Sequence, residues 1–456
     1  MSKARLDGLQ LLLLGSVFFV LAGIAMGHFS PFGLGDLKQV YYGARSLMEH
    51  HDPYLPGELL ALYRTEGGAI PSDPGTARSV GLIVSLCTNL PTTLLLAAPF
   101  ALLPWKVAVA LWLTLIASAF LLASFLMWDV AGNGAPRFSA GLLFLLIANS
   151  ELLLSTGNAA GLVIGLTVIT VWCFLRERYV LAGVVCLAVG LAIKPHDAGP
   201  VWLYFLLAGG VLRKRALQSL ALAAVLSVPA ILWVSSVAPH WPQELRANLS
   251  TSMSPGGRDA PGPSSAGGRG IGMVIALQAI AAQFRDDPRF YNPVVYVLLG
   301  ALLLIWSVKT LRSTFSPRSA WFALAAISAL AMLPVYHRVY DARLLLLTIP
   351  ACTILWTEGG PLRWWAMLLN LAGILVTGDM TWAIVFHSVG YTPVSLAVGM
   401  IPAPLVLLVL GIFYLCVFVR CGAPSGRCAG ERRQEIERPV DPGPLVFSVL
   451  RIWRAA

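Results

Sequence analysis

The sequence predicts an all-α protein that crosses a membrane many times. Of its 456 residues, 57% are hydrophobic and only 12% are charged, whereas a soluble domain carries about 25% charged residues. The mean hydropathy is +0.76, and the apolar residues gather in long stretches. Because lipid offers no partner to backbone polar groups, each stretch must form a helix that pairs those groups internally. We therefore expect a bundle of about twelve transmembrane helices.

The expected helices follow from the lengths of the apolar stretches. A spanning helix needs about 20 apolar residues. The stretches that approach this length are 9–27, 106–128, 138–155, 157–175, 179–194, 198–212, 216–238, 293–308, 319–335, 341–357, 362–386 and 395–419. A further apolar stretch, 82–105, contains Pro91, Pro99 and Pro104, and proline interrupts helices. We expect 82–105 to re-enter the membrane or to lie at its surface.

Basic loop residues predict the orientation, because they stay on the cytoplasmic side of a membrane. With twelve spans, all of the following fall on one side: Lys3, Arg5, Arg137, Arg176, Arg178, Arg213, Lys214, Arg215, Lys309, Arg312, Arg318, Arg363 and Arg420. We therefore expect a multi-pass protein of the cell membrane, of the bacterial inner-membrane type, with both termini in the cytoplasm. The two large polar segments, 28–105 and 239–292, then share the opposite face, where we expect the active site, facing the periplasm or the exterior.

Composition also limits the partners. The net charge of +10 comes mostly from the basic loops and from a charged tail, 421–456, that we expect to be disordered and separate from a membrane domain of residues 1–420. Nucleic-acid binding would gather this charge on one face with interleaved aromatic residues, so we expect membrane lipids as partners and no nucleic acid. Seven scattered cysteines show no metal-ligand spacing. We expect no cofactor.

The first large segment carries the candidate base. It begins "FSPFGLGDLKQVYYGARSLMEHHDPY", residues 29–54, and the spacing of Leu37, Val40, Ala44 and Leu47 predicts an amphipathic helix. Asp36 occupies the position of an N-cap. A carboxylate held at the membrane surface can accept a proton from a sugar or lipid hydroxyl, so Asp36 is predicted to be a general base, a role compatible with capping. Two tyrosines of this segment, Tyr41 and Tyr54, are predicted to contact the substrate.

Two further candidates stand at predicted helix ends on the outer side. Lys194 ends a span in "GLAIKPHDAGP", and an ionisable residue at such a place indicates function. It is predicted to bind a phosphate or diphosphate, the alternative being a lysine that reaches the lipid headgroups. Asn158 follows Gly157 before a predicted helix. It is predicted either to contact a sugar or only to cap that helix.

A third cluster lies in "LPVYHRVYDARLLLLTIP", residues 333–350. If this stretch is helical, His337 and Asp341 share a face, and Asp341 orients a catalytic His337. Arg338 and Arg343 are predicted to bind the donor phosphate, whose developing charge requires fixed positive donors. Tyr336 and Asp341 are predicted to contact the substrate. The alternative is a patch of salt bridges, and one histidine with one aspartate is too little to predict a metal site.

The second large segment contains "SMSPGGRDAPGPSSAGGRG", residues 252–270. Its glycine, proline and serine content is typical of a flexible linker. The alternative is a flap that becomes ordered over a bound substrate.

Three stretches resemble the polytopic glycosyltransferases of family 87, in the GT-C superfamily. They are "GDLKQVYYGARSLMEHHDPYLP", "STGNAAGLVIGLTVITVWCFLRERYVLAGVVCLAVGLAIKP" and "YDARLLLLTIP". The resemblance, from about residue 10 to about residue 420, implies a GT-C-type bundle whose large outer loops carry helices at the membrane surface. It also implies transfer of a mannosyl or arabinofuranosyl unit from a polyprenyl-phosphate donor to a lipid or glycan acceptor on the non-cytoplasmic face. The resemblance implies that Asp36 takes the position of the family's first-loop acid and that Lys194 takes its "KP" position after the fifth span. It also implies that His337 and Asp341 lie where the family places outer-face polar residues near the donor phosphate.

The chemistry of that reaction suits these residues, with mannose as the expected sugar. A lipid phosphate leaves readily, so one base and several cations suffice without the carboxylate pair of glycoside hydrolysis. Two alternatives remain open. One is a polymerase or ligase of lipid-linked polysaccharide with a diphosphate-linked donor, and the other is a polyprenyl-lipid transporter or flippase without enzymatic activity. The latter commonly shows repeats, and this sequence has no repeat of useful length.

Overall fold

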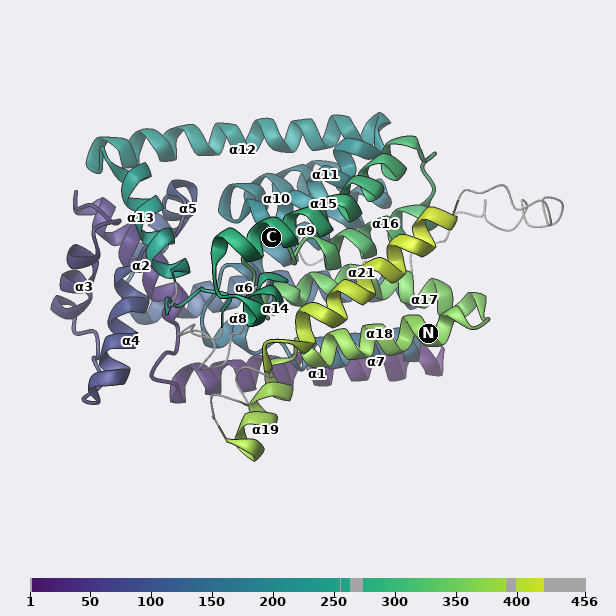
Figure 1. Cartoon of the computed structure of the whole chain (residues 1–456), viewed down its shortest axis with the longest axis horizontal. Helices are drawn as coiled ribbons and strands as arrows, with labels where there is room; N and C mark the ends of the chain where they lie inside the picture. The colour runs from purple at the N-terminus through teal and green to yellow at the C-terminus, as the bar shows by residue number, and fades with distance from the viewer. Residues whose placement is uncertain (1, 255, 263–273, 391–398, 422–456) are drawn as a thin grey trace, which may run out of the picture. The chain divides into compact units, whose positions relative to one another are not determined.

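The protein is helical throughout the part of the chain that the computed structural model describes, which is residues 2–254, 256–262, 274–390 and 399–421. These ranges contain no strand, and Val274 and Arg338 form an isolated bridge; the all-α class is thus confirmed (Figure 1). The helices are α1 (Lys3–Phe29), α2 (Gly35–Met48), α3 (Pro56–Thr65), α4 (Pro74–Ser85), α5 (Pro91–Ala101), α6 (Trp105–Ala131), α7 (Pro136–Ile147), α8 (Leu152–Ser155), α9 (Ala160–Leu175), α10 (Val180–Ile193), α11 (Pro195–Ala208), α12 (Gly210–Val237), α13 (Trp241–Met253), α14 (Gln278–Phe284), α15 (Pro288–Arg312), α16 (Pro317–Leu330), the 3₁₀ helix η2 (Asp341–Leu347), α17 (Thr348–Glu358), α18 (Leu362–Val376), α19 (Asp379–Val389) and α21 (Pro402–Arg420). The predicted tail, 421–456, lies outside the described residues except for Cys421.

Six helical stretches in the described residues are long and apolar enough to cross a membrane. They are α1, α6, Pro136–Ser155, α12, α15 and α21. A seventh arises if α18 and α19, which meet at a bend of 62°, count as one span. The chain therefore has the helices of a multi-pass membrane protein, whereas the predicted number of twelve is not confirmed.

The difference comes from helix length, because α9 has 16 residues and α16 has 14, fewer than the about 20 that a span needs. These short apolar helices are also largely surrounded by protein. In α9, 13 of 16 residues are buried, and α16 is buried along 11 of its 14 residues. In contrast, only 17% of the apolar stretch of α12 is buried. A helix that is apolar on every side is either buried in a protein or exposed to lipid, and hydropathy alone does not separate the two cases.

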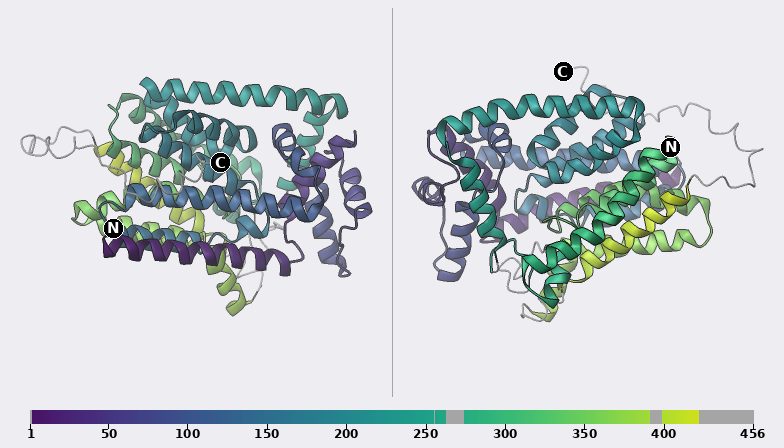
Figure 2. Two further views of the ribbon diagram at one scale, coloured as in Figure 1. Left: turned by 180° about the vertical axis from the view of Figure 1, so that it is seen from behind. Right: turned by 45° about the horizontal axis from the view of Figure 1, so that its top comes forward.

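The two large polar segments meet at one end of the bundle. Helices α2–α5 and α13 gather there in all views (Figures 1 and 2). A shared apolar core joins them, made of Leu47, Tyr54, Leu59, Cys87, Leu94, Val234, Ala238 and Leu245. The side-chain amide of Asn248 donates hydrogen bonds to the backbone carbonyls of Tyr54 and Cys87, at 2.9 and 3.1 Å. Helices α2–α5 and α13, which belong to the two predicted outer segments, thus lie together at one end of the helices (Figure 1), while the common membrane face of segments 28–105 and 239–292 stays a prediction.

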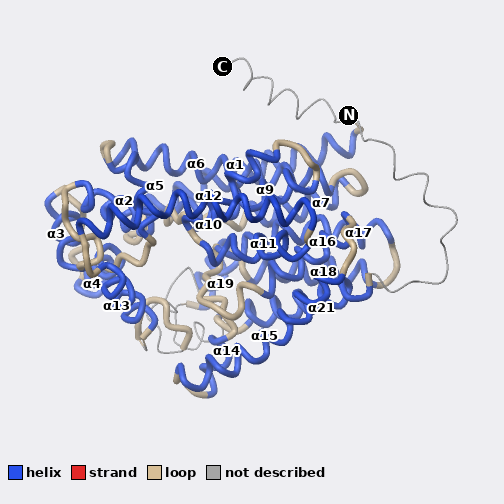
Figure 3. Tube along the Cα trace, turned by 90° about the horizontal axis from the view of Figure 1, so that it is seen from above, coloured by secondary structure: helices blue, strands red, loops and turns tan. Residues whose placement is uncertain are grey.

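Basic turns lie at the other end of the long helices. Arg5 donates a hydrogen bond to Asn133 at 2.6 Å, and Arg137 pairs with Asp7 at 2.5 Å, so the turn between α6 and α7 lies beside the start of α1. Figure 3 shows the α2–α5 group well away from α7, α17 and α18. This separation of loops fits the predicted charge asymmetry, and the assignment of this end to the cytoplasm stays a prediction.

Two details of the first segment bear on the site. Leu37, Val40, Ala44 and Leu47 are all buried, which confirms the predicted apolar face of α2. The predicted N-cap role of Asp36 is wrong. Helix α2 begins at Gly35, so Asp36 lies inside its first turn, and the N-cap residue is Leu34, which makes no side-chain hydrogen bond to the helix. In the stretch 82–105, α4 ends at Ser85, the 11-residue α5 covers Pro91–Ala101 and α6 begins at Trp105, so this stretch is not one continuous span.

Close approach of α9 to α6 generates a first prediction. A Cβ atom added to Gly165 would lie 2.6 Å from the backbone carbon of Ala119, and small residues allow such contacts between membrane helices. Replacing Gly165 by alanine should therefore lower the free energy of unfolding by about 1–3 kcal/mol through overpacking. Thermal unfolding in detergent measures this change. The control Gly141→Ala, whose Cβ meets nothing within 4 Å, should not destabilise the protein, and equal losses for both variants would contradict the predicted contact.

Candidate functional site

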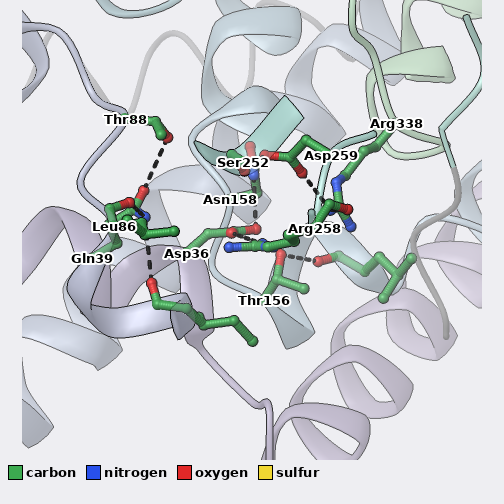
Figure 4. Close-up of polar contacts among 12 residues, drawn as sticks. Asp36, Gln39, Leu86, Thr88, Thr156, Asn158, Ser252, Arg258, Asp259 and Arg338 are labelled. Carbon is green, nitrogen blue, oxygen red and sulfur yellow. Dashed lines mark hydrogen bonds and ion pairs between the residues drawn. The ribbon is translucent and has the colours of Figure 1, made fainter. Parts of the chain in front are cut away.

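Asp36 lies where the first polar segment meets the bundle. The backbone N–H groups of Asp36 and Leu37 donate to the carbonyl of Thr156, at 3.1 and 3.2 Å, so the first turn of α2 is attached to the turn before α9. The Asp36 carboxylate then accepts hydrogen bonds from two side chains (Figure 4). Asn158 donates to Oδ2 at 2.8 Å and Arg258 donates to Oδ1 at 2.9 Å. The carboxylate is therefore held in one orientation.

Asn158 caps α9 and also contacts Asp36, while its predicted contact with a sugar stays a prediction. Its side-chain oxygen accepts a hydrogen bond from the backbone N–H of Ala160, at the start of α9. This bond fixes the amide so that its NH₂ group faces Asp36. Capping and site formation thus use opposite ends of the same side chain.

The second polar segment contributes a pair of opposite charges. Beside Arg258, the carboxylate of Asp259 accepts hydrogen bonds from Arg338 Nη2 at 2.6 Å and from the Tyr336 hydroxyl at 2.7 Å. It also accepts one from the Ser252 hydroxyl. Ser252, Arg258 and Asp259 are therefore bound to the site, and the description of a freely moving linker does not apply to these three residues. The flap hypothesis for 252–270 stays a prediction, since 255 and 263–270 lie outside the described residues.

These contacts keep both carboxylates ionised. Burial alone would raise the pKa of Asp36, but the Arg258 guanidinium and the Asn158 hydrogen bond hold it below its ordinary value. Burial likewise opposes ionisation of Asp259, and the charges of Arg338 and Arg258 nevertheless lower its pKa to about 2. At neutral pH the site therefore alternates positive and negative groups.

Lys194 joins the third sequence cluster to the end of α10. Its Nζ atom lies 2.8 Å from Asp341 Oδ1 and 3.0 Å from Asp197 Oδ2. The other oxygen of Asp341 accepts the backbone N–H of Arg338 at 2.8 Å. Asp197 also approaches His337, with Oδ1 3.4 Å from Nε2. Two segments more than a hundred residues apart in the sequence thus share one ion-pair network.

The predicted helix through His337 and Asp341 is wrong. Residues 331–340 form turns and an isolated bridge, and the 3₁₀ helix begins only at Asp341. As a consequence, His337 contacts the carboxylate of Asp197, whereas Asp341 contacts Lys194. A turn allows adjacent side chains to point in different directions, which helical spacing does not predict.

Tyr340 connects the Asp36 part of the site to the Lys194 part. Its ring is buried and lies 5.6 Å from Lys194 Nζ. Burial raises the pKa of Tyr340 well above its ordinary value, and the charge of Asp36 raises it further while Arg338 opposes the shift. Asp36, Arg338 and Lys194 therefore surround one tyrosine.

Three other predicted residues make hydrogen bonds or ion pairs outside the Asp36 and Lys194 networks. Arg343 is fully buried and pairs with Asp379 at 3.0 Å, so the structure does not place it with Arg338. The hydroxyl of Tyr41 donates to the backbone carbonyl of Leu103 at 2.9 Å. The hydroxyl of Tyr54 donates to the carbonyl of Asn89 at 3.0 Å. Hydrogen bonding thus gives all three a part in holding the fold.

Sequence reasoning missed four contributors, which are Arg258, Asp259, Asp197 and Tyr340. A signal existed for Asp197, which stands three residues after Lys194 at the start of α11, where helical spacing brings the two side chains together. Arg258 and Asp259 are adjacent opposite charges inside a segment otherwise rich in glycine, proline and serine. Their partners lie far away in the sequence, so no local pattern identifies them.

An apolar cavity adjoins the charged network. It has a volume of about 170 Å³ between α11, α15 and α16. Its lining includes Gly199 and Pro200, which closely follow Asp197, and Pro334, which closely precedes Tyr336. The molecule therefore offers a proton-accepting carboxylate, a group of cations suited to an anion, and an apolar space nearby.

Comparison with known proteins does not assign this site to a family. No family model, no curated protein and no solved structure matches the chain. The function must therefore be inferred from the geometry of the residues themselves.

The buried pair of Asp259 and Arg338 generates a second prediction. Replacing Asp259 by asparagine should lower the free energy of unfolding by about 3 kcal/mol, because a buried guanidinium loses the negative charge of its partner. The matched control is Glu358→Gln, since Glu358 pairs with Arg318 while both side chains are more than 40% exposed. This control should cost less than about 1 kcal/mol. Thermal unfolding in detergent compares the two variants, and equal losses would contradict the proposed burial of the pair.

Proposed function

We propose that this protein is a membrane glycosyltransferase that moves a sugar, with mannose as the first choice, from a polyprenyl-phosphate donor to a hydroxyl of a lipid or glycan acceptor. The observation that carries the proposal is the position of Asp36. Its carboxylate is oriented by Asn158 and lies within one network with Arg258, Arg338 and Lys194. Transfer of a sugar from a phosphate-linked donor requires a general base next to a group of cations that binds the phosphate.

In the proposed reaction, an oxygen atom of the acceptor attacks the anomeric carbon of the donor sugar. The acceptor hydroxyl gives its proton to Asp36, a bond forms between the acceptor oxygen and the anomeric carbon, and the bond from that carbon to the phosphate oxygen breaks. Polyprenyl phosphate leaves with the electron pair. Arg338 and Lys194 stabilise the negative charge that develops on the leaving group.

Arg258 gives the site a means of activating its base. A general base works best with a pKa near the working pH, whereas Arg258 holds the pKa of Asp36 below its ordinary value. A donor phosphate that takes over the Arg258 guanidinium would remove this effect. Burial, which raises the pKa of Asp36, would then make the carboxylate a stronger base only when the donor is bound.

The apolar cavity supports a lipid-linked donor. A cavity of about 150 Å³ accommodates a ring of six carbon atoms, so the space between α11, α15 and α16, at about 170 Å³, suits roughly one isoprene unit. It adjoins Asp197 along α11 and Tyr336 along the chain after α16. We place the first isoprene units of the donor there and its phosphate at Lys194 and Arg338.

The arrangement of loops supports a reaction on the non-cytoplasmic face. Segments 28–105 and 239–292 supply Asp36 and Arg258, and their helices α2–α5 and α13 lie at one end of the bundle (Figure 1). Basic turns such as that of Arg137 lie at the other end, and basic loops stay in the cytoplasm. Under this proposal the lipid donor is used in the outer leaflet.

Replacing Asp36 by asparagine tests the base. Transfer from polyprenyl-phosphate mannose in membranes should fall by at least about 100-fold, because general-base catalysis contributes about 10²–10⁴-fold. Asp73→Asn is the control, since Asp73 caps α4 outside the site and asparagine caps equally well. Unchanged transfer by a folded D36N variant would remove Asp36 from the mechanism. Activity of the wild type only with a diphosphate-linked donor would favour a polysaccharide polymerase or ligase instead.

Filling the apolar cavity tests the donor lipid. A Cβ atom added to Gly199 would have no atom within 4 Å. The leucine of Gly199→Leu should therefore fill the cavity without moving the backbone. The KM for a long-chain donor should rise about tenfold at unchanged kcat, because about 0.8 kcal/mol is lost for each CH₂ group that is no longer buried.

The matched control is Gly300→Leu on α15, where an added Cβ likewise meets nothing within 4 Å. It should leave the KM for every donor unchanged. A water-soluble donor with a short chain should be used equally well by G199L and by the wild type. An equal rise in KM for short and long chains would contradict the placement of the isoprene units.

A further inference from the structure

Two histidines and an aspartate converge beside Lys194. His196 and Asp197 stand in the first turn of α11, and His337 lies on the segment that leads to η2. The two imidazole rings are 5.2 Å apart between centroids. One ligand atom from each of the three side chains lies within 4.8 Å of the other two. The sequence placed only His337 and Asp341 together, which is too few ligands for a metal site.

The hydrogen bonds of His337 determine which ring nitrogen carries hydrogen. Its Nδ1 lies 3.1 and 3.2 Å from the backbone carbonyls of Met332 and Val335. Carbonyl oxygens only accept hydrogen bonds, so Nδ1 must be the protonated nitrogen. In the neutral ring, Nε2 then presents its lone pair to Asp197 Oδ1, 3.4 Å away. Two acceptor atoms that face each other require a cation between them, either a proton or a metal ion.

We propose that His196, Asp197 and His337 bind a divalent transition-metal ion, with Zn²⁺ as the best match. Imidazole nitrogen and carboxylate oxygen are preferred zinc ligands, and bonds of about 2.0–2.2 Å place tetrahedral ligand atoms about 3.3 Å apart. Asp197 Oδ1 lies 3.4 Å from His337 Nε2 and 3.8 Å from His196 Nε2. The three side chains therefore need only small movements to close around one ion.

The surroundings also suit a metal ion. Nitrogen ligands in metal sites commonly donate their other N–H to a carbonyl, as His337 does. The second oxygen of Asp197 is held by Lys194 at 3.0 Å. His196 is 39% exposed in its side chain, so one side of the group is open. Three protein ligands with an open fourth position are typical of zinc sites that bind a water or a substrate atom.

The charges of the network favour an additional cation. Lys194, Arg258 and Arg338 face four carboxylates, which belong to Asp36, Asp197, Asp259 and Asp341. A buried group with one excess negative charge is costly unless a further cation neutralises it. A divalent ion leaves the whole group with one excess positive charge. The proposal concerns metal binding alone and does not depend on the sugar-transfer reaction.

Metal binding by the purified full-length chain tests this inference. The protein, carrying a tag without histidines, is stripped with a chelator and titrated with Zn²⁺, and bound zinc is counted by mass spectrometry. We expect one Zn²⁺ for each chain, and Co²⁺ in its place should give the visible absorption of tetrahedral coordination. Loss of a residue that only supports a metal ligand weakens metal binding by about 10–100-fold. His196→Ala removes a ligand itself and should therefore weaken zinc binding by more than this.

Two further variants make the result specific. His196→Cys supplies a thiolate, which is also a zinc ligand, and should restore binding that H196A loses. His240→Ala removes an exposed histidine outside the group and should bind zinc like the wild type. Absence of stoichiometric zinc in the wild type would overturn the inference. The cation between His337 and Asp197 would then be a proton, held as an ion pair of the two side chains. Zinc retained in full by H196A would overturn it as well.

Discussion

The requirement that buried charges be paired governs this structure. A charged side chain is costly in an apolar environment unless an opposite charge and hydrogen bonds surround it. Here Asp36 pairs with Arg258, Asp259 with Arg338, and Asp341 with Lys194. Each pair joins two segments that are far apart in the sequence. The pairs therefore determine how the polar loops dock on the helices.

That docking explains why so many polar residues lie at one end of a lipid-soluble chain. Helix α2 contributes an acid to the network and buries its apolar face against α5 and against the core that it shares with α13. The backbone of its first turn is bound to Thr156, so Asp36 is fixed from both the backbone and the side chain. A carboxylate held on a rigid helix is better positioned for proton transfer than one on a free loop.

The two proposals concern neighbouring parts of one network. Tyr340 connects the Asp36 part to the Lys194 part, and Asp197 joins Lys194 to the histidine group. The network contains three lysine or arginine side chains and four carboxylates. A divalent ion beside Lys194 would reverse this balance and place a second positive group near the cavity lined by Gly199. Metal binding and donor binding would then support each other electrostatically.

The sequence alone determined the helical class, the membrane setting and the apolar face of α2, because each depends on the type and spacing of nearby residues. It also singled out Asp36, Lys194 and His337, since charged residues next to apolar spans are rare. Only the tertiary structure showed that Asp197 contacts His337, that Arg258 and Asp259 close the network, and that α9 and α16 face protein instead of lipid. These facts depend on contacts between segments distant in the chain. Local pattern carries no information about such contacts, because the same hydrophobicity or charge is satisfied equally well by lipid, by water or by another helix.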